Sequence, residues 1–309
     1  MTSHAVVMAC NAGYAPYAFC MAEQIARAHP DRDFDICIFS DEALALPPSL
    51  AALGLRLVTL GADNPFLDIP NPSRHGHSTY LRLLVPQHLG QSYDRILYLD
   101  SDILLHGGGL DRLMRADLHG RAIGAVRDHQ QWRNPARQVA EFRRMGLPQA
   151  GYFNAGVLLI DVARFAAKEV LPRAIALMRG KPEVLLRHDQ SLLNLLLRDD
   201  WAELSPVWNW QYTSASRHFA ALAEPRLLHF IGSRKPWADL KNQLPASFRR
   251  TYRDFQTRHY PDRPDICTAD PSALGWPDKL ASSLLRHAIS AGRMHSYLAR
   301  FPDPFRAAP

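Results

Sequence analysis

Arg95-Ile96-Leu97-Tyr98-Leu99-Asp100-Ser101-Asp102 is a short apolar run of strand type that ends in two carboxylates one residue apart. Alternate side chains of an extended segment share a face, so Asp100 and Asp102 can point the same way at a strand end. Two hard oxygen ligands, with no basic residue between them, suit Mg²⁺ or Mn²⁺ holding a diphosphate. The alternative is a turn that binds no metal, because Asp is common in turns.

Strands and helices alternate along the chain around this stretch. Apolar runs predict strands at residues 4–9, 34–39, 55–60 and 122–126, and helical spacing predicts helices at 15–28, 77–89 and 110–115. This order predicts an α/β fold with a mostly parallel sheet and helices on both faces. Such sheets bind ligands at the carboxyl ends of their strands, where Asn11 and Asp100 both fall.

Composition places the chain among globular proteins. It has 309 residues, of which 47% are hydrophobic and 21% are charged. It shows no uninterrupted apolar run of membrane-spanning length and no secretory leader, so we expect a cytoplasmic protein. The four cysteines form no Cys-x-x-Cys pair, which argues against structural zinc.

Positive charge is concentrated in the last part of the chain. The net charge is +6, and from Lys241 onward eleven Lys and Arg stand against six Asp and Glu. The nearly neutral remainder argues against a nucleic-acid partner. We therefore expect a main domain at residues 1–265 and a mainly helical basic extension at 266–309.

Basic residues recur every seven positions in this extension, at Lys279, Arg286, Arg293 and Arg300. On a helix they would drift by only ~20° per step and form one stripe. Such a helix could lie on an anionic membrane surface, each cation contributing about 1 kcal/mol. The alternative is a helix docked on the core with its arginines in solvent.

Four further segments occur in a fixed order around the Asp-x-Asp stretch: Ser78-Thr79-Tyr80-Leu81-Arg82-Leu83, Tyr152-Phe153-Asn154-Ala155-Gly156-Val157, His188-Asp189-Gln190-Ser191 and His229-Phe230-Ile231-Gly232-Ser233-Arg234-Lys235-Pro236-Trp237. Together the five closely resemble glycosyltransferase family 8, retaining enzymes that include bacterial lipopolysaccharide galactosyl- and glucosyltransferases and glycogenin. The resemblance runs from about residue 5 to 237. It implies a GT-A nucleotide-sugar-binding fold, a UDP-sugar donor and Mn²⁺, with Mg²⁺ as the alternative metal.

The resemblance also assigns roles to individual residues. It implies that Asp100, Asp102 and His229 bind the metal, although His229 alone could be a core histidine. The other positions fall into groups: Gly232 and Lys235 near the diphosphate, Arg82 at the donor phosphate or sugar, Asn11 and Tyr14 at the uracil, Asn154, Ala155 and Gly156 along the donor sugar, and Asp189 and Gln190 beside the anomeric carbon on its acceptor side. Ser101 also belongs to the implied donor-binding residues.

Two positions depart from the family pattern. Relatives commonly show Asp-Gln-Asp where this chain has Asp189-Gln190-Ser191, and they often carry Asp where it has Asn11. The first departure puts the sugar or acceptor contacts in doubt, and the second weakens the uracil assignment. Neither touches the metal pair.

These observations favour a retaining transferase that moves glucose or galactose from UDP to lipopolysaccharide or another surface glycan, on the inner face of the cell membrane. Because the neutral amide of Gln190 is a poor nucleophile, we expect front-face transfer. One alternative is a nucleotidyltransferase, although the loop after the first strand carries no cation. The other is a non-catalytic nucleotide-sugar or glycan-binding protein.

Overall fold

The computed structural model describes residues 3–61, 63–69, 76–239, 243–263 and 280–308. Its strands are β1 His4–Ala9, β2 Asp35–Ser40, β3 Arg56–Thr59, β4 Arg95–Leu99, β5 Ile103–Leu105, β6 Ile123–Arg127, β7 Phe153–Asp161, β8 Trp201–Glu203, β9 Trp210–Gln211 and β10 Leu227–His229. Its α-helices are α1 Ala15–Ala28, α2 Val85–Leu89, α3 Leu110–Met114, α4 His129–Trp132, α5 Ala140–Arg144, α6 Val162–Ala166, α7 Val170–Gly180, α8 His188–Leu196, α9 Ala220–Ala223, α10 Ala246–His259 and α11 Leu280–Leu298. Its 3₁₀ helices are η1 Pro48–Leu53, η2 His77–Leu83, η3 Pro182–Val184, η4 Pro206–Trp208, η5 Arg217–Phe219 and η6 Pro236–Ala238.

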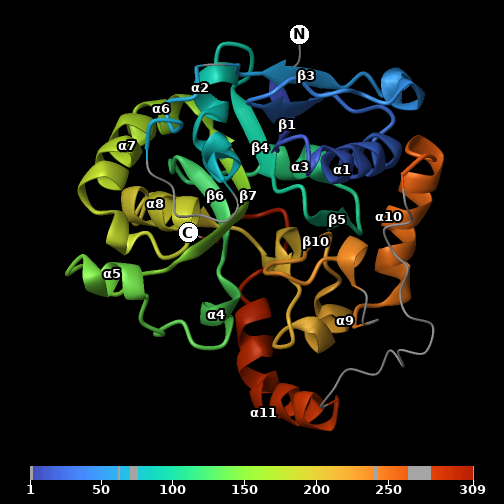
Figure 1. Ribbon diagram of the computed structural model, residues 1–309. Helices are drawn as coiled ribbons and strands as arrows, with labels where there is room; N and C mark the ends of the chain where they lie inside the picture. Colours follow the sequence, from blue (N-terminus) through green and yellow to red (C-terminus); the bar gives the residue numbers. More distant parts are fainter. Residues whose placement is uncertain (1–2, 62, 70–75, 240–242, 264–279, 309) are drawn as a thin grey trace.

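A seven-stranded sheet forms the centre of the molecule, with the order β3-β2-β1-β4-β7-β6-β8 (Figure 1). Strand β7 runs antiparallel to both of its neighbours, and the other pairings in this sheet are parallel. A second sheet has the order β5-β10-β9. The mixed, mostly parallel sheet confirms the predicted α/β class.

Alternate side chains of β1 show which helices cover each face of the large sheet. Val6 and Met8 join one buried cluster with Phe19 of α1, whereas Ala5 and Val7 join another with residues of α2, α7 and α8. Successive strand side chains point to opposite faces, so a strand apolar at every position must be covered on both sides. Helices therefore pack on both faces, as the sequence predicts.

Two local predictions were wrong. In place of the single helix expected over 77–89 there is a 3₁₀ helix, η2, followed by the short α-helix α2. Pro86 stands in the first turn of α2, where its missing amide hydrogen prevents the hydrogen bond that would continue a single helix through Arg82. Asp100 to Asp102 also form a turn rather than the extended end of a strand.

The C-terminal segment packs against the rest of the chain. Met294, Tyr297 and Phe301 belong to the main buried cluster, and Ala308 pairs with Glu203 of β8. Arg300 lies beyond the end of α11 and forms an ion pair with Glu203 at 2.9 Å, so the basic stripe predicted through Arg300 was wrong at that position.

Lys279 and the predicted boundary at 265/266 lie outside the described residues, and the two-domain division stays a prediction. Among the helices that the structure describes, none is long and apolar enough to cross a membrane.

Candidate active site

A cavity of about 400 Å³ opens where the two sheets meet. Every residue that the sequence singled out lines it: Asn11, Tyr14, Arg82, Asp100, Ser101, Asp102, Asn154, Ala155, Gly156, Asp189, Gln190, His229, Gly232 and Lys235. They come from η2, the turn between β4 and β5, β7, α8, β10 and the loops after β1 and β10. The fold therefore collects residues more than two hundred positions apart into one site.

Strand register explains why the three predicted metal ligands converge. The Asp100-Ser101-Asp102 turn links β4 of the large sheet to β5 of the small sheet. The antiparallel pairing of β5 with β10 places His229 opposite Ile103, next to Asp102. On the other side, the Asp100 amide donates to the Gly156 carbonyl of β7 at 2.8 Å.

The three side chains have the geometry of a divalent-cation site. Their ligand atoms lie within 4.8 Å of one another. His229 Nε2 is 3.1 Å from Asp102 Oδ1 and 3.7 Å from Asp100 Oδ2. Among the residues that the structure describes, none donates a hydrogen bond to the buried Asp102 Oδ1, which is costly unless a cation is bound there. Two carboxylates and an imidazole suit Mn²⁺ better than an all-oxygen ion such as Ca²⁺.

Gly156 leaves the space that this group requires. A Cβ at this position would lie 2.2 Å from His229 Cε1 and 2.9 Å from Asp100 Oδ2. Any larger residue would push both ligands out of place. The glycine of the Asn154-Ala155-Gly156 segment is thus explained by the metal ligands, and its predicted place along the donor sugar stays a prediction.

Hydrogen bonds fix the orientation of the His229 ring. Its Nδ1 lies 2.9 Å from Asn209 Oδ1, which can only accept, so Nδ1 carries the proton and the neutral ring turns the Nε2 lone pair toward the aspartates. Asn209 in turn donates to Asn154 Oδ1 at 2.8 Å, and Asn154 donates to Gln190 Oε1 at 3.0 Å. Hydrogen-bonded side chains therefore connect the predicted metal ligand His229 to Gln190, which is predicted to lie beside the anomeric carbon.

Asn209 was not among the predicted site residues, and it yields a test. We expect Asn209→Leu to weaken Mn²⁺ binding by about 10- to 100-fold, because His229 loses the acceptor that fixes its tautomer. Asn209→Asp keeps an acceptor oxygen at that position and should retain most of the affinity. Isothermal titration of folded variants with Mn²⁺ measures both. Equal affinity for Asn209→Leu and the wild type would contradict this role.

Arg82 bridges the metal group and the sugar side of the cavity. Its guanidinium contacts Asp100 Oδ1 and Asp189 Oδ2, each at 2.8 Å, and donates to the Ala155 carbonyl at 2.6 Å. Its plane also lies over the Tyr98 ring, 4.8 Å from the centroid. Arg82 thus holds two carboxylates apart and in place. Its predicted contact with the donor stays a prediction.

Asp189 is a buried carboxylate with an unusual titration. Burial raises the pKa of Asp189 to about 6, although Arg82 acts against this shift. At Asp102 burial also opposes ionisation, but the positive charge of Lys235 holds the pKa of that carboxyl below its ordinary value. Near neutral pH both groups are ionised, whereas mild acid neutralises Asp189 first.

This difference predicts the acidic side of the pH profile. Asp189 must be ionised to pair with Arg82, so we expect activity to fall as the pH drops through about 6. Asp189→Asn should show lower activity without this inflection, because an amide does not titrate. Rates of UDP release measured from pH 5 to 8 test it. An unchanged inflection in Asp189→Asn would assign it to another group.

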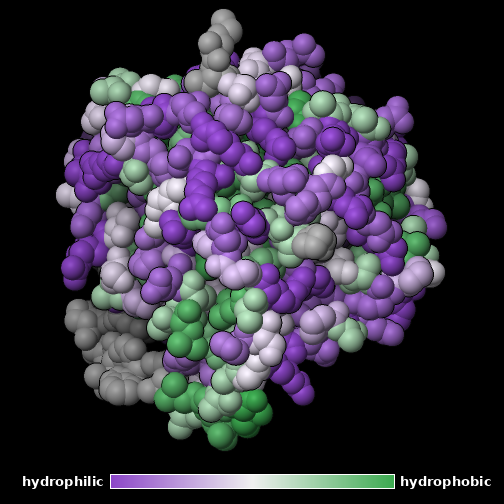
Figure 2. Space-filling view, turned by 180° about the vertical axis from the view of Figure 1, so that it is seen from behind, coloured by the Kyte–Doolittle hydropathy of each residue, from purple (hydrophilic) through white to green (hydrophobic). Residues whose placement is uncertain are grey.

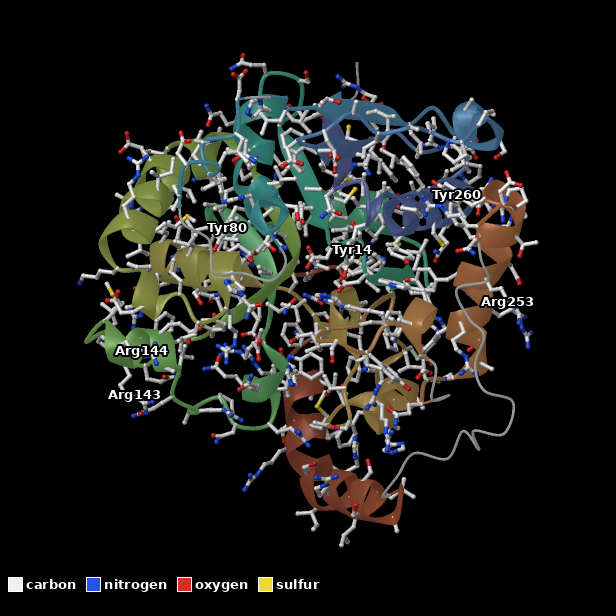
Figure 3. The ribbon with its side chains drawn as sticks, viewed as in Figure 1. Tyr14, Tyr80, Arg143, Arg144, Arg253 and Tyr260 are labelled. Carbon is white, nitrogen blue, oxygen red and sulfur yellow. The ribbon has the colours of Figure 1, made fainter. Side chains whose placement is uncertain are left out.

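The remaining predicted residues occupy two ends of the cavity. Lys235 donates to Asp102 Oδ2 and to the Phe230 carbonyl, and Gly232 adopts a φ of 80° that favours glycine. Asn11 accepts the Tyr14 amide at 3.1 Å, and Tyr14 lies half-exposed at the start of α1 near the middle of the molecule (Figure 3). Ser101 is buried at the cavity wall.

The departure at Ser191 lies behind the cavity wall, not on it. The Ser191 hydroxyl donates to Glu141, which also accepts from Tyr152 and from Arg187. Arg187 itself lines the cavity. Sequence reasoning missed Glu141 and Arg187, because Glu141 stands on α5, far from every motif, and only the fold brings it beside α8.

Comparisons with known proteins agree with this geometry. The model of the family described as Glycosyl transferase family 8 matches residues 5–241. Glycosyltransferase GlyF of Streptococcus pneumoniae is 33% identical over 52% of this chain and 38% of its own length. Lipopolysaccharide glucosyltransferase WaaO of Escherichia coli K12 is 29% identical over 58% of this chain and 54% of its own. The chain therefore spans about half or less of these two relatives.

A solved structure shows the same fold. The galactosyltransferase LgtC, crystallised with donor and acceptor sugar analogues, superposes with a TM-score of 0.65 at 24% sequence identity. The match covers 83% of this chain and 96% of LgtC. The arrangement of two sheets around the cavity is thus a GT-A arrangement.

Proposed function

The chain belongs to glycosyltransferase family 8, and from this we propose that it transfers glucose or galactose from a UDP-sugar to a lipopolysaccharide or another surface glycan, with retention at the anomeric carbon. The observation that carries the proposal is the Asp100–Asp102–His229 group inside a cavity lined by every expected donor-binding residue. The curated relatives that act on lipopolysaccharide support the acceptor class.

Departure of UDP leaves negative charge on the diphosphate, and catalysis requires that this charge be neutralised where it develops. Asp100, Asp102 and His229 would hold a divalent cation, which supplies Lewis-acid stabilisation of the leaving group. Lys235 now donates to Asp102, and its ammonium group would turn to share a phosphate oxygen. Arg82 keeps Asp100 oriented through this change.

Front-face transfer fits the chemistry of the sugar side. A double displacement needs a free carboxylate near the anomeric carbon, but Asp189 is paired with Arg82 and Gln190 is a neutral amide. In front-face transfer the acceptor hydroxyl attacks on the side of the leaving group, and a diphosphate oxygen takes its proton. A covalent glycosyl-enzyme trapped on Asp189 would contradict this route.

Release of UDP tests the proposal. Purified protein is incubated with each member of a UDP-sugar panel in Mn²⁺ or in EDTA. We expect metal-dependent release from UDP-glucose or UDP-galactose, and NMR of the transferred sugar should show a retained anomeric configuration. UDP binding without turnover in the presence of lipopolysaccharide would instead favour a non-catalytic binding protein.

We further propose that α11 rests on an anionic membrane surface. Leu284, Leu285 and Ile289 are exposed on it beside Arg286 and Arg293, and Figure 2 shows a hydrophobic patch at the end of the molecule where α11 lies. Exposed apolar side chains flanked by cations are typical of helices at membrane interfaces.

We expect Leu284→Ser/Leu285→Ser/Ile289→Ser to lose co-sedimentation with phosphatidylglycerol vesicles while UDP release in solution stays unchanged. The exposed Leu67 lies outside α11, so Leu67→Ser serves as the matched control. Equal sedimentation of the triple variant and the control would refute the membrane contact.

A further inference from the structure

Residues of α11, of η5 and of the segment directly after α4 bring basic side chains together beside the cavity. Arg133, directly after α4, donates to Ser290 of α11 at 2.9 Å. The His218 ring of η5 meets the His287 ring of α11 edge-on, with centroids 4.6 Å apart. Arg217 contacts His218 through its Nε at 3.2 Å. We call Arg133, Arg217, His218 and His287 the basic junction.

The basic junction has no acidic counterpart in the described part of the chain. Neither Arg133 nor Arg217 forms an ion pair there, although most arginines near the cavity do. Burial lowers the pKa of His287, and Arg133, Arg217 and Arg286 lower it further, which shows that uncompensated positive charge converges on this ring. Such a field attracts an anion.

Buried polar atoms at the same place also lack partners. His287 is 5% exposed and Ser283 is 2% exposed. His287 Nδ1 donates to the Ser283 carbonyl at 2.7 Å, but within the described part of the chain His287 Nε2 and Ser283 Oγ have no hydrogen-bond partner. Unpartnered buried polar atoms are costly. An anion would accept from Ser283 Oγ, and it would favour protonation of His287 Nε2, which would then donate to it as well.

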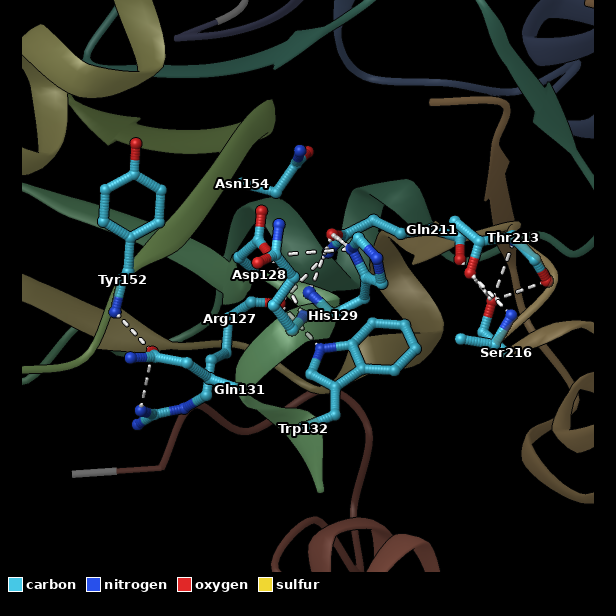
Figure 4. Close-up of polar contacts among 12 residues, drawn as sticks. Arg127, Asp128, His129, Gln131, Trp132, Tyr152, Asn154, Gln211, Thr213 and Ser216 are labelled. Atoms are coloured by element: carbon cyan, nitrogen blue, oxygen red, sulfur yellow. Dashed lines mark hydrogen bonds and ion pairs between the residues drawn. The ribbon is translucent and has the colours of Figure 1, made fainter. Parts of the chain in front are cut away.

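The basic junction adjoins the sugar side of the cavity. Gln190 of the cavity wall donates to Asp128 at 3.3 Å, and Asp128, which precedes His129, caps α4 by accepting from the Gln130 amide. His129 and Gln211 are joined by hydrogen bonds, and the Ser216 hydroxyl donates to the Gln211 carbonyl at 2.5 Å (Figure 4). Arg217 is the next residue in the chain. Burial lowers the pKa of His129, and the positive charges of Arg133 and of the cavity residue Arg187 lower it further. Hydrogen bonds and neighbouring residues in the chain therefore connect the cavity to the basic junction.

We propose that the basic junction binds a phosphate group carried by the acceptor glycan, while the sugar to be extended lies at Gln190. Donors arriving from three elements suit a tetrahedral anion better than a planar carboxylate, which two parallel donors already satisfy. This inference rests on the proposed function. It adds a substrate class to it: a phosphorylated acceptor.

Imidazole NMR of the full chain, with UDP and Mg²⁺ filling the cavity, tests the site. We expect inorganic phosphate and a hexose phosphate, but not the unphosphorylated hexose, to shift the His218 and His287 signals saturably. Arg133→Gln/Arg217→Gln should need about tenfold more phosphate, because two charge-assisted hydrogen bonds are lost. Arg253→Gln is the matched control, since Arg253 lies on α10 and points away from the body of the molecule (Figure 3).

Vesicles distinguish a lipid headgroup from a glycan phosphate. We expect the double variant to sediment with phosphatidylglycerol-containing vesicles as the wild type does. Loss of sedimentation, with no response of the imidazoles to hexose phosphate, would assign the junction to a lipid and overturn the proposal. No response to any phosphate would also overturn it. Wild-type UDP release, measured separately, decides the proposed function whatever the imidazoles show.

Discussion

Asp102→Asn is expected to reduce metal-dependent UDP release by roughly two to three orders of magnitude. Asp102 contributes the buried oxygen that lies 3.1 Å from His229 Nε2, and it also holds the Lys235 ammonium group. The amide has nearly the same shape, so the fold should persist while one anionic ligand is lost. Rates with UDP-glucose and UDP-galactose at saturating Mn²⁺ measure the effect.

The matched control is Asp254→Asn, which removes an exposed carboxylate of α10 whose described ion-pair partner is Arg253 at 4.0 Å. It should leave both the rate and the Mn²⁺ requirement unchanged. Near-wild-type release by Asp102→Asn, with the same dependence on Mn²⁺, would show that another group holds the metal.

The second large effect concerns stability. Arg82→Met is expected to lower the free energy of unfolding by about 3–5 kcal/mol, because it leaves Asp100 and Asp189 buried together without their shared cation. Urea denaturation near neutral pH measures the loss.

Arg82→Met/Asp189→Asn should recover a substantial part of that loss, because only one unpaired carboxylate then remains. The double variant thus separates the electrostatic cause from lost packing over Tyr98. If Arg82→Met alone unfolds at the wild-type urea concentration, the bridge contributes little to stability.

The sequence predicted the central elements and the site's membership for a physical reason. A residue at the carboxyl end of a strand, such as Asp100, can be found in the sequence because it is the polar residue that ends an apolar run. His229 was recognised only through the order of five motifs, because a lone histidine after two leucines is equally suited to a core. The predicted residues line one cavity, and their individual roles stay predictions. The Asp100–Asp102 turn is not the extended strand end expected from the sequence.

Other features depend on contacts that no local pattern encodes. Asn209 fixes the His229 tautomer only because β9 and β10 pair in parallel, and Glu141 reaches Ser191 only because α5 packs beside α8. The seven-residue repeat gives no sign that Arg300 has an acidic partner, yet Arg300 forms an ion pair with Glu203 of β8. Ion pairs between distant segments are set by tertiary packing, and periodicity along one helix does not reveal them.

Anomalous diffraction from a crystal grown with Mn²⁺ and UDP tests the central claim most directly. The account predicts one manganese peak bounded by Asp100, Asp102 and His229, with the UDP diphosphate beside it and Tyr14 near the uracil. UDP bound in the cavity with no manganese at these three residues, or with manganese held elsewhere, would contradict it.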